Sequence, residues 1–289
     1  MTATVSVCVP VYQGERHLRA TLDSVLAQEG VAFDVVVVDN ASTDGTAQIL
    51  ASYSDRRLRV VTNPRTIPMT ANFAVAVAAT SGDYVKLCCA DDLLLPGALA
   101  TQSAVLRARP EISVVASRRL FIDDDDRAVG PVGLRGFLGR HGGRAIARRY
   151  VRWGINPVGE PACVMFRRGD YEAVGGWATN TSYPSDIETW FRLLRRGDLF
   201  GQPDALAAFR LAQQAHSQTH EDQNHEENLE LIRRVARDPF WRIGRRDRIL
   251  SRLLQPLAWR AWRVQRRRLF VSAALPDTHV IDEHRAGGR

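Results

Sequence analysis

Two short runs of almost unbroken apolar residues near the start of the chain limit its fold more than any other feature. Val5–Val11 (VSVCVPV) and Asp34–Asp39 (DVVVVD) are rich in β-branched residues, which favour strands. Between the two runs, apolar residues recur at the spacing of one helix face: Leu18, Leu22, Val25 and Leu26. Strands that lack alternating polar residues are typical of a parallel sheet covered by helices on both faces. The pattern therefore predicts an α/β protein.

The same alternation of strands and helices continues along the next part of the chain. Further strands are expected at Leu58–Thr62 and Tyr84–Cys88, and alanine-rich helices at Ala71–Ala79 and Ala98–Ala108. In parallel sheets, ligands bind beyond the carboxyl ends of the strands. Three carboxylates lie at or just after the ends of predicted strands: Asp39, Asp91 and Asp92. We therefore expect a ligand site at this edge of the sheet.

The positive charge of the chain is concentrated in one segment. The formal net charge is +7, yet Arg242–Arg268 alone holds ten arginines against one acid, Asp247. The 289 residues are enough to bury a large core, in one domain or in two closely packed ones. No apolar run approaches the ~18 residues of a membrane span, and the four cysteines match no zinc or disulfide spacing. These features predict a cytoplasmic protein with a basic tail.

The carboxylates at the predicted strand ends have two interpretations when each is taken alone. Asp39, followed by Asn-Ala-Ser-Thr-Asp-Gly-Thr, could bind a base or a ribose, or could cap a loop or a helix. The adjacent Asp91 and Asp92 repel each other unless a cation or hydrogen-bond donors relieve them. They therefore favour either Mg²⁺ or Mn²⁺, or the capping of the following helix.

Another candidate carboxylate belongs to a later helix, predicted from Ser185 to about Arg196. Glu188 lies three residues after Ser185, which predicts a capping box at the start of this helix. Asp186 falls in the first turn. There it could take part in chemistry or stabilise the helix dipole.

Motifs in a fixed order connect these carboxylates. They are Pro10-Val-Tyr12 at the end of the first strand, Val38-Asp-Asn-Ala-Ser-Thr-Asp-Gly-Thr46, Ala90-Asp-Asp-Leu93, Gly175-Gly-Trp177 and Ser185-Asp-Ile-Glu-Thr-Trp190. Over roughly residues 3–215 the chain resembles glycosyltransferase family 2. The resemblance implies an inverting enzyme with the glycosyltransferase-A fold. That fold is a Rossmann-like, mostly parallel sheet flanked by helices, here with a C-terminal helical extension.

The resemblance also implies roles for individual residues. It places the following residues around the nucleotide-sugar donor: Pro10, Tyr12, Glu15, Asp39, Asn72 and Lys86. Asp91 is implied to hold Mn²⁺ or Mg²⁺ on the diphosphate, with Asp92 beside it, and Asp186 to be the catalytic base. Acceptor specificity is expected within Gly133–Pro161. Its entrance is expected to be lined by Asn156, Gly159, Glu160 and Pro161.

Two positions depart from the family pattern. Cys89 stands where many members have an aspartate, so a ribose contact is expected to be lost. Phe209-Arg210-Leu211 is followed by Ala212, where many members have a metal-binding histidine. Either His216 replaces that ligand from a shifted loop, or it is a surface histidine.

Together these features predict a transferase that moves a sugar from a nucleotide-diphosphate sugar to an acceptor hydroxyl. The product is expected to be a cell-envelope polysaccharide, a glycolipid or another glycoconjugate. We expect residues 1–119 to bind the donor and residues 120–239 to bind the acceptor and supply the base. Residues 240–289 are expected to form a basic amphipathic helical tail.

Two other functions agree less well with the sequence. A sugar-phosphate nucleotidyltransferase would need a glycine-rich loop after the first strand, which Tyr12–Arg16 does not provide. A nucleic-acid-binding protein could use the arginine-rich tail, but zinc-finger spacing and RNA-recognition aromatic motifs are absent from the sequence. No nucleic-acid partner is therefore expected.

The tail itself has two interpretations. Phe240–Phe270 carries an apolar helical stripe among its arginines, and Pro256 is expected to break the helix. Basic helices of this kind bind anionic membrane surfaces, and such contact over residues 240–270 would place the protein peripherally at the inner face of the membrane. It would suit a lipid-linked acceptor. The alternative is that the stripe packs on the catalytic domain.

Overall fold

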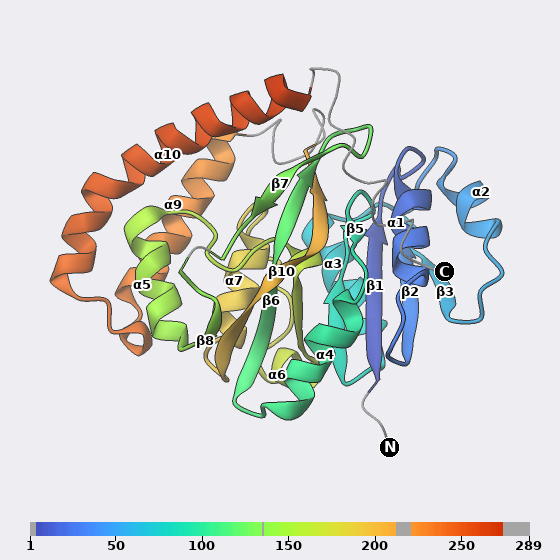
Figure 1. Cartoon of the computed structure of the whole chain (residues 1–289), viewed down its shortest axis with the longest axis horizontal. Coiled ribbons are helices and arrows are strands. Elements are labelled where there is room, and N and C mark those ends of the chain that lie inside the picture. The colour runs from blue at the N-terminus through green and yellow to red at the C-terminus, as the bar shows by residue number, and fades with distance from the viewer. Residues whose placement is uncertain (1–3, 135, 212–220, 274–289) are drawn as a thin grey trace.

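The computed structural model describes residues 4–134, 136–211 and 221–273, and within them one ten-stranded sheet runs through the molecule (Figure 1). Its main strands lie in the order β3 (Leu58–Thr62), β2 (Phe33–Asp39), β1 (Val5–Val11), β4 (Tyr84–Leu87), β9 (Val164–Arg167), β6 (Ile112–Ile122), β10 (Asp198–Arg210) and β5 (Leu93–Leu94). β7 (Ala128–Val132) pairs with β6, and β8 (Gly139–His141) pairs with β10.

Most of the long strands point the same way. β3, β2, β1 and β4 are parallel neighbours, and β6 is parallel to β10. β9 is antiparallel to both β4 and β6, so it joins the two parallel groups and leaves them in the same direction. The predicted mostly parallel sheet is confirmed. One edge of it collects the carboxyl ends of β1, β2, β4, β6 and β10.

Helices cover the sheet in front and behind (Figure 1). They are α1 (Leu18–Leu26), α2 (Thr46–Ala51), α3 (Met69–Ala78), α4 (Ala98–Ala108), α5 (Gly143–Trp153), α6 (Arg168–Ala173), α7 (Ser185–Leu193), α9 (Glu221–Arg237) and α10 (Arg245–Ala273), with short 3₁₀ turns at Pro161–Cys163 and Pro239–Trp241. α3 packs on β1, β2 and β4, whereas α4 packs on β6, β9 and β10. The helices predicted from the alanine-rich stretches are confirmed.

The apolar runs seen in the sequence form the centre of the core. Val5, Val7 and Val9 of β1 and the four valines Val35–Val38 of β2 are completely buried. Because both faces of these strands are covered, neither face needs polar residues. Burying each such side chain contributes about 1.5–3 kcal/mol relative to leaving it exposed. The core therefore accounts for the continuous valine pattern.

The C-terminal part of the chain adds a helical layer beside the sheet. α5 packs against both α9 and α10, and α10 runs along the outside of this layer (Figure 1). The expected break at Pro256 is wrong, because α10 continues through that residue. Pro256 removes one helical N–H, but Pro256 and Arg252, four residues earlier, are both exposed, so water can hydrogen-bond the unpaired carbonyl. No helix among the described residues is long and apolar enough to cross a bilayer.

Candidate active site

The loops that follow β1 and β2 are joined to each other at the carboxyl edge of the sheet. The side-chain carbonyl of Gln13 accepts hydrogen bonds from the backbone N–H groups of Thr43 (2.7 Å) and Asp44 (3.3 Å). The N–H of Gln13 donates to the hydroxyl of Ser42 at 2.9 Å. Gln13 adopts a left-handed backbone conformation, with φ of 52°. These contacts fix one loop against the other.

Glu15 belongs to the same junction. Its carboxylate accepts a hydrogen bond from the N–H of Gly45 at 3.1 Å. A Cβ at position 45 would lie 2.9 Å from the carboxyl carbon of Glu15, so the glycine permits this close approach. Of the two other residues expected near the donor here, Tyr12 is 54% exposed beside the loop, whereas Pro10 is buried within β1.

Asp39 ends β2 and is almost completely buried. One of its carboxylate oxygens accepts a hydrogen bond from the N–H of Ser42 at 3.1 Å, as in a loop cap. Asn72 is buried in a neighbouring amide network, in which Asn63 donates to the side-chain oxygens of both Asn72 (2.8 Å) and Asn40 (2.9 Å). The structure thus places Asn72 behind the β2 loop, where it supports the backbone.

Lys86 does not reach the loops at the strand ends. Its side chain is completely buried, and its ammonium donates to the side-chain carbonyl of Gln102 on α4 at 2.6 Å. Burial lowers the pKa of Lys86 to about 8. Gln102 in turn donates to the carbonyl of Cys163. The only lysine of the chain therefore ties α4 to the sheet.

The paired acids follow β4 directly and are held by an arginine from β10. Arg210 is completely buried; its backbone N–H donates to Asp92 at 3.1 Å, and its guanidinium donates to the carbonyl of Asp91 at 2.9 Å. The other carboxylate oxygen of Asp92 is buried and has no hydrogen-bond partner among the described residues. Burial raises the pKa of both carboxyls, and the charge of Asp91 raises that of Asp92 further.

These acids fit a divalent cation. Ligand atoms of Cys89, Asp91 and Asp92 all lie within 4.8 Å of one another. The unpartnered oxygen of Asp92 and the raised pKa values both indicate that a bound cation would stabilise the charged form of these carboxyls. Carboxylate oxygens are the ligands that Mg²⁺ and Mn²⁺ prefer, whereas a thiol suits softer metals. We therefore assign the fit to the two carboxylates.

The same arginine also binds the acidic hairpin Asp123–Asp126 between β6 and β7. Its guanidinium donates to the carbonyl of Asp123 and to the carboxylate of Asp126. At the hairpin, Asp124 pairs with Arg16 at 3.3 Å, so the hairpin also reaches the β1 loop. Hydrogen bonds between Asp123 and Arg127 close the hairpin turn. The hairpin therefore both turns the chain and binds the buried guanidinium of Arg210.

Asp186 lies in the first turn of α7. One carboxylate oxygen accepts the N–H of Ile187 at 2.7 Å, and the other accepts from the side-chain amide of Asn156 at 3.3 Å. Burial raises the pKa of Asp186 to about 7, a larger effect than the opposing hydrogen bond from Ile187. A carboxyl with this pKa can both accept and release a proton near neutral pH.

Three of the four residues expected at the acceptor entrance, Asn156, Gly159 and Glu160, form one compact loop, and Pro161 begins the 3₁₀ turn that follows it. The side-chain oxygen of Asn156 accepts the N–H of Gly159 at 3.0 Å, and its amide donates to the carbonyl of Gly159 at 3.1 Å. Gly159 has a φ of 126°, which favours glycine. Glu160 is bound through both carboxylate oxygens by Arg119, at 2.5 and 2.9 Å.

The structure brings the acids from separate segments together electrostatically. The charge of Glu160 raises the pKa of both Asp92 and Asp186, after burial as the larger cause. Burial also raises the pKa of the Cys89 thiol, and the charges of Asp92, Asp91 and Asp186 raise it further. Asp91, Asp92, Glu160 and Asp186 therefore share one site. His216, the other candidate metal ligand, lies outside the described residues.

The sequence did not single out two arginines that organise this site. Arg210 ends an otherwise apolar stretch, Ala205–Arg210, and Arg119 interrupts β6. A charged residue at the end of a buried strand was the available signal, because a buried guanidinium needs acidic or carbonyl partners. What the sequence could not show was which acids these are.

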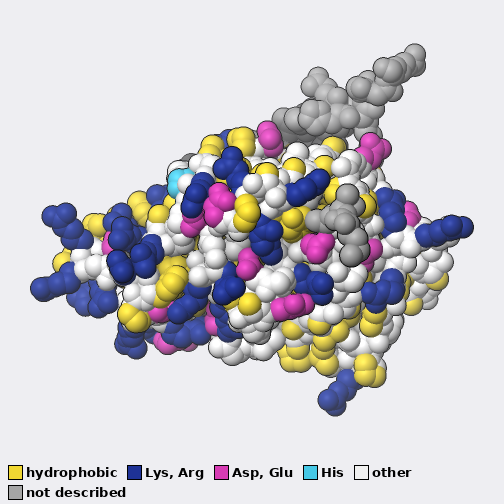
Figure 2. Space-filling model, turned by 90° about the horizontal axis from the view of Figure 1, so that it is seen from below, with side chains coloured by type: hydrophobic (Ala, Val, Ile, Leu, Met, Phe, Trp, Pro, Cys, Tyr) yellow, Lys and Arg dark blue, Asp and Glu magenta, His cyan; other side chains and the backbone are white. Residues whose placement is uncertain are grey.

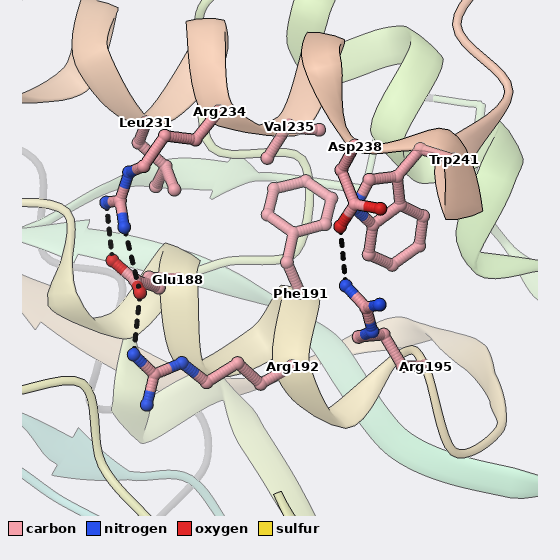
Figure 3. A pocket seen from close by; sticks show the side chains of 9 residues that line it. All are labelled: Glu188, Phe191, Arg192, Arg195, Leu231, Arg234, Val235, Asp238 and Trp241. Atoms are coloured by element: carbon pink, nitrogen blue, oxygen red, sulfur yellow. Dashed lines mark hydrogen bonds and ion pairs between the residues drawn. The ribbon is translucent and has the colours of Figure 1, made fainter.

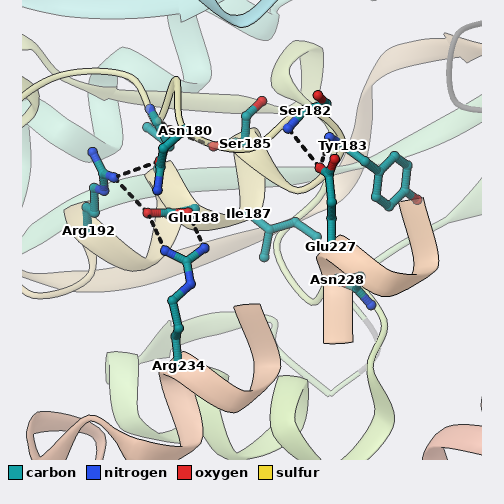
Figure 4. A network of polar contacts seen from close by, with 12 residues as sticks. Asn180, Ser182, Tyr183, Ser185, Ile187, Glu188, Arg192, Glu227, Asn228 and Arg234 are labelled. Atoms are coloured by element: carbon teal, nitrogen blue, oxygen red, sulfur yellow. Dashed lines mark hydrogen bonds and ion pairs between the residues drawn. The ribbon is translucent and has the colours of Figure 1, made fainter. Parts of the chain in front are cut away.

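The capping box predicted at α7 is wrong. Ser185 lies inside the helix, and Pro184 occupies the capping position without a side-chain hydrogen bond. Glu188 instead binds Arg192 (2.7 Å) and Arg234 of α9 (2.7 Å), as Figure 4 shows. Hydrogen bonds from both arginines lower the pKa of Glu188, although burial alone would raise it.

A pocket of about 190 Å³ lies on the other side of α7, between this helix and α9 (Figure 3). Its floor is apolar, formed by Phe191, Leu231, Val235 and Trp241, and Glu188, Arg192, Arg195, Arg234 and Asp238 surround it. The charged groups are paired across it, as Arg195 with Asp238 at 2.5 Å. None of the site acids lines this pocket, so we do not assign the chemistry to it.

The sheet topology is that of the glycosyltransferase-A fold. The chain belongs to glycosyl transferase family 2, whose family model matches residues 6–175.

Relatives of known sequence agree with this assignment. The chain is 32% identical over 212 residues to "Uncharacterized protein MT1568" of Mycobacterium tuberculosis (strain CDC 1551 / Oshkosh), covering 71% of this chain and 66% of that protein. It is 29% identical to "Putative glycosyltransferase EpsE" of Bacillus subtilis (strain 168), covering 67% of each. It is also 29% identical to "O-antigen biosynthesis protein RfbC" of Myxococcus xanthus, over 68% of this chain and 16% of that protein. The chain thus spans about two thirds of the first two.

Solved structures share the fold at lower identity. The mannosyltransferase PcManGT from Pyrobaculum calidifontis, in complex with GDP-Man and Mn²⁺, aligns with a TM-score of 0.64 at 20% identity, covering 95% of this chain and 76% of that one. TarS 1–349 of S. aureus, in complex with UDP-GlcNAc, aligns with a TM-score of 0.60 at 19% identity, covering 80% and 66%.

Proposed function

We propose that this protein transfers a sugar from a nucleotide-diphosphate sugar to an acceptor hydroxyl, with inversion at the anomeric carbon. The observation that carries the proposal is the separation of roles among the site acids. Asp91 and Asp92 are adjacent buried carboxyls whose pKa values are raised by burial despite the nearby charge of Arg210, whereas Asp186 is a separate buried carboxyl with a pKa of about 7. The paired acids are suited to binding the leaving group through a cation, and Asp186 is suited to proton transfer.

For the donor, we propose the joined β1 and β2 loops as the nucleotide site. Asp39 and Glu15 present carboxylates there, and the exposed ring of Tyr12 lies beside them. Carboxylates can accept hydrogen bonds from a base N–H or from ribose hydroxyls. PcManGT and TarS are named with bound GDP-Man and UDP-GlcNAc, which supports a nucleotide-sugar donor here. Residues 1–119 would then form the donor-binding half of the site.

For the leaving group, we propose that Asp91 and Asp92 hold Mn²⁺ or Mg²⁺. When bound, the cation would neutralise charge on the departing diphosphate without donating a proton. Arg210 orients both acids through its bonds to the Asp91 carbonyl and the Asp92 carboxylate. The Mn²⁺ named in the PcManGT complex supports this choice of cation.

For the transfer step, we propose Asp186 as the general base. It takes the proton of the acceptor hydroxyl while the acceptor oxygen bonds to the anomeric carbon. The bond from that carbon to the diphosphate oxygen breaks, and its electron pair leaves with the diphosphate. Attack on the face opposite the leaving group inverts the centre, and the transition state resembles an oxocarbenium ion. Asn156 fixes the orientation of the Asp186 carboxyl.

For the acceptor, we propose the loop Asn156–Glu160, within residues 120–239. Glu160 and Arg119 offer an acceptor and a donor of hydrogen bonds near Asp186, and sugar hydroxyls use both. The protein named for O-antigen biosynthesis among the relatives supports a product such as a cell-envelope polysaccharide or a glycolipid.

A thermal-shift panel tests the proposal. Purified protein is heated with UDP-, GDP- and dTDP-sugars, each with and without Mn²⁺, because a ligand that binds only the native state raises the melting temperature. We expect at least one donor to stabilise the protein, and only with the cation. If none does, while a nucleoside triphosphate with a sugar 1-phosphate does, the protein is a nucleotidyltransferase instead.

A further inference from the structure

α10 presents two different faces. Its inner face is fastened to the layer beneath: Asp247 pairs with Arg152 of α5 at 2.6 Å, and Gln255 donates to the carbonyl of Val151 at 2.6 Å. Further along, Trp259 stacks on His225 of α9, with ring centroids 4.3 Å apart. The inner face of α10 therefore packs on the rest of the protein, as one of the two interpretations of the tail expects.

The outer face leaves large apolar side chains in water. Ile249, Leu253, Leu257 and Val264 are each more than half exposed, and Leu250 lies at the edge of the same stripe. Spacings of four, four and seven residues place the four on one side of a helix, over several turns. Scattered apolar residues are normal on a surface, but several aligned along one side of an exposed helix indicate an interaction site.

The charge beside this stripe has one sign. Exposed arginines accompany it along the helix: Arg245, Arg246, Arg248, Arg252, Arg260 and Arg263. Asp247, the only acid in α10, points inward and is bound by Arg152. Figure 2 shows Lys and Arg side chains gathered at the end of the molecule that α5, α9 and the start of α10 form, with hydrophobic side chains between them. The face is therefore both apolar and strongly cationic.

We propose that the outer face of α10 binds the surface of an anionic lipid bilayer. The helix would lie in the plane of the membrane, with the apolar stripe in the interface and the arginines at the lipid phosphates. Each arginine near such a surface strengthens binding, and the attraction falls with salt. α10 does not cross the bilayer in this arrangement, in agreement with its composition.

Two other occupants fit the face less well. A second copy of the chain would bring two arginine rows together with no outward acid on either helix to offset them, which costs free energy. A nucleic acid would satisfy the arginines but would leave the apolar stripe in water. Only an anionic lipid surface complements both features at once.

The placement of α10 gives the proposal a consequence for the acceptor. The helix ends near β7, on the side of the molecule towards which β6 and β10 direct their carboxyl ends (Figure 1). The acid site lies at that same edge. If the proposed transfer is correct, an acceptor anchored in the bilayer would meet Asp186 without leaving the membrane surface. This consequence rests on the proposed function, whereas lipid binding by α10 does not.

Vesicle co-sedimentation of the full chain tests the proposal. Vesicles of phosphatidylcholine with about 30% phosphatidylglycerol are compared with pure phosphatidylcholine, at low and high salt. We expect binding to the anionic vesicles only, weakened by salt. The double variant L253S/L257S should bind them about tenfold or more weakly, because it removes two side chains from the interface. The matched control V60S/M69S alters two exposed apolar residues outside α10 and should bind as the wild type does.

Three results would overturn the proposal. One is the absence of binding to anionic vesicles at low salt, and another is equal binding by L253S/L257S. The third is a concentration-dependent dimer, seen by sedimentation velocity, that the double variant abolishes while vesicle binding is absent. Because the altered residues lie outside the site and on the surface, donor-induced thermal shifts should stay unchanged in the variant. A failure of lipid binding is thus separable from a failure of donor binding.

Discussion

Arg234 of α9 binds Glu188 of α7 through two hydrogen bonds, at 2.7 and 3.2 Å (Figure 4). Glu188 lies two residues after Asp186 on the same helix. Glu227, also from α9, accepts the backbone N–H groups of Ser182 (2.8 Å) and Tyr183 (3.0 Å), just before α7 begins. α9 therefore holds both the start of α7 and the segment that leads into it, and so fixes the direction of the Asp186 carboxyl.

From this contact we predict that Arg234→Gln lowers turnover several-fold while donor affinity changes little. Arg192 still pairs with Glu188 in the variant, so α7 should loosen rather than unfold. The melting temperature should fall by a few degrees, as expected for about 1 kcal/mol in a protein of this size. Steady-state kinetics and calorimetric donor binding separate the two effects.

The neighbouring residue provides the control for this prediction. Arg233 is more exposed, and its one ion pair among the described residues is with Glu230 of its own helix at 3.1 Å, so Arg233→Gln should leave turnover unchanged. A role of Arg234 in positioning α7 would be refuted if both variants behaved alike, or if Arg234→Gln lost donor binding and turnover equally.

The raised pKa of Asp186 predicts a pH dependence. The base must be deprotonated to accept a proton, so turnover should rise with pH through about 7 and then level off. Asp186→Asn should keep donor binding, lose roughly 10²–10⁴-fold in turnover, and lose this inflection. Asp170→Asn is the control, since Asp170 occupies the first turn of α6 and pairs with Arg196 away from the site.

The same pKa has a consequence for stability. Because the folded-state pKa lies above the ordinary value of 3.8, the folded protein holds this proton more tightly, and stability falls as pH rises from about 4 to about 7. Asp186→Asn removes that loss, so its melting temperature should exceed the wild-type value more at pH 8 than at pH 5. A variant less stable than wild type at pH 8 would argue that Asp186 has a structural role.

At the donor end of the site, Asp39→Ala should weaken donor binding by about 1.5–3 kcal/mol, the contribution of a hydrogen bond to a charged group. Calorimetry measures this directly. Asp55→Ala is the control, because Asp55 precedes β3 at the opposite edge of the sheet and binds Arg57. Unchanged affinity in Asp39→Ala would leave Asp39 as a loop cap only.

The local parts of this fold follow from the sequence because their causes are local. Val5–Val11 and Leu58–Thr62 begin and end where the apolar and β-branched runs do. Ala98–Ala108 is a helix with the predicted bounds.

The structure differs from the sequence-based expectations where a residue's contacts are made with a segment distant in the sequence. Glu188 has the spacing of a capping box, but Arg234, 46 residues later, offers it a stronger charge-assisted bond. The resemblance places Lys86 near the nucleotide, whereas its ammonium donates to the side chain of Gln102 of α4 inside the core. Pro256 breaks helices in general, but on the exposed side of a long helix packed on α5 its missing N–H is tolerated. The role of Arg210 does not follow from the sequence, because its partners come from two distant segments, the adjacent Asp91 and Asp92 and the hairpin Asp123–Asp126.

The most direct test of donor and cation binding at the paired acids is calorimetric titration of the best donor from the thermal-shift panel. The titration is run with Mn²⁺ and then with EDTA, for the wild type, Asp91→Asn and the control Asp170→Asn. We expect the wild type and Asp170→Asn to bind the donor with Mn²⁺ only, and Asp91→Asn to bind it weakly or not at all under both conditions. Equal affinity in EDTA, or undiminished Mn²⁺-dependent binding by Asp91→Asn, would contradict the assignment of Asp91 and Asp92 to the cation and the diphosphate.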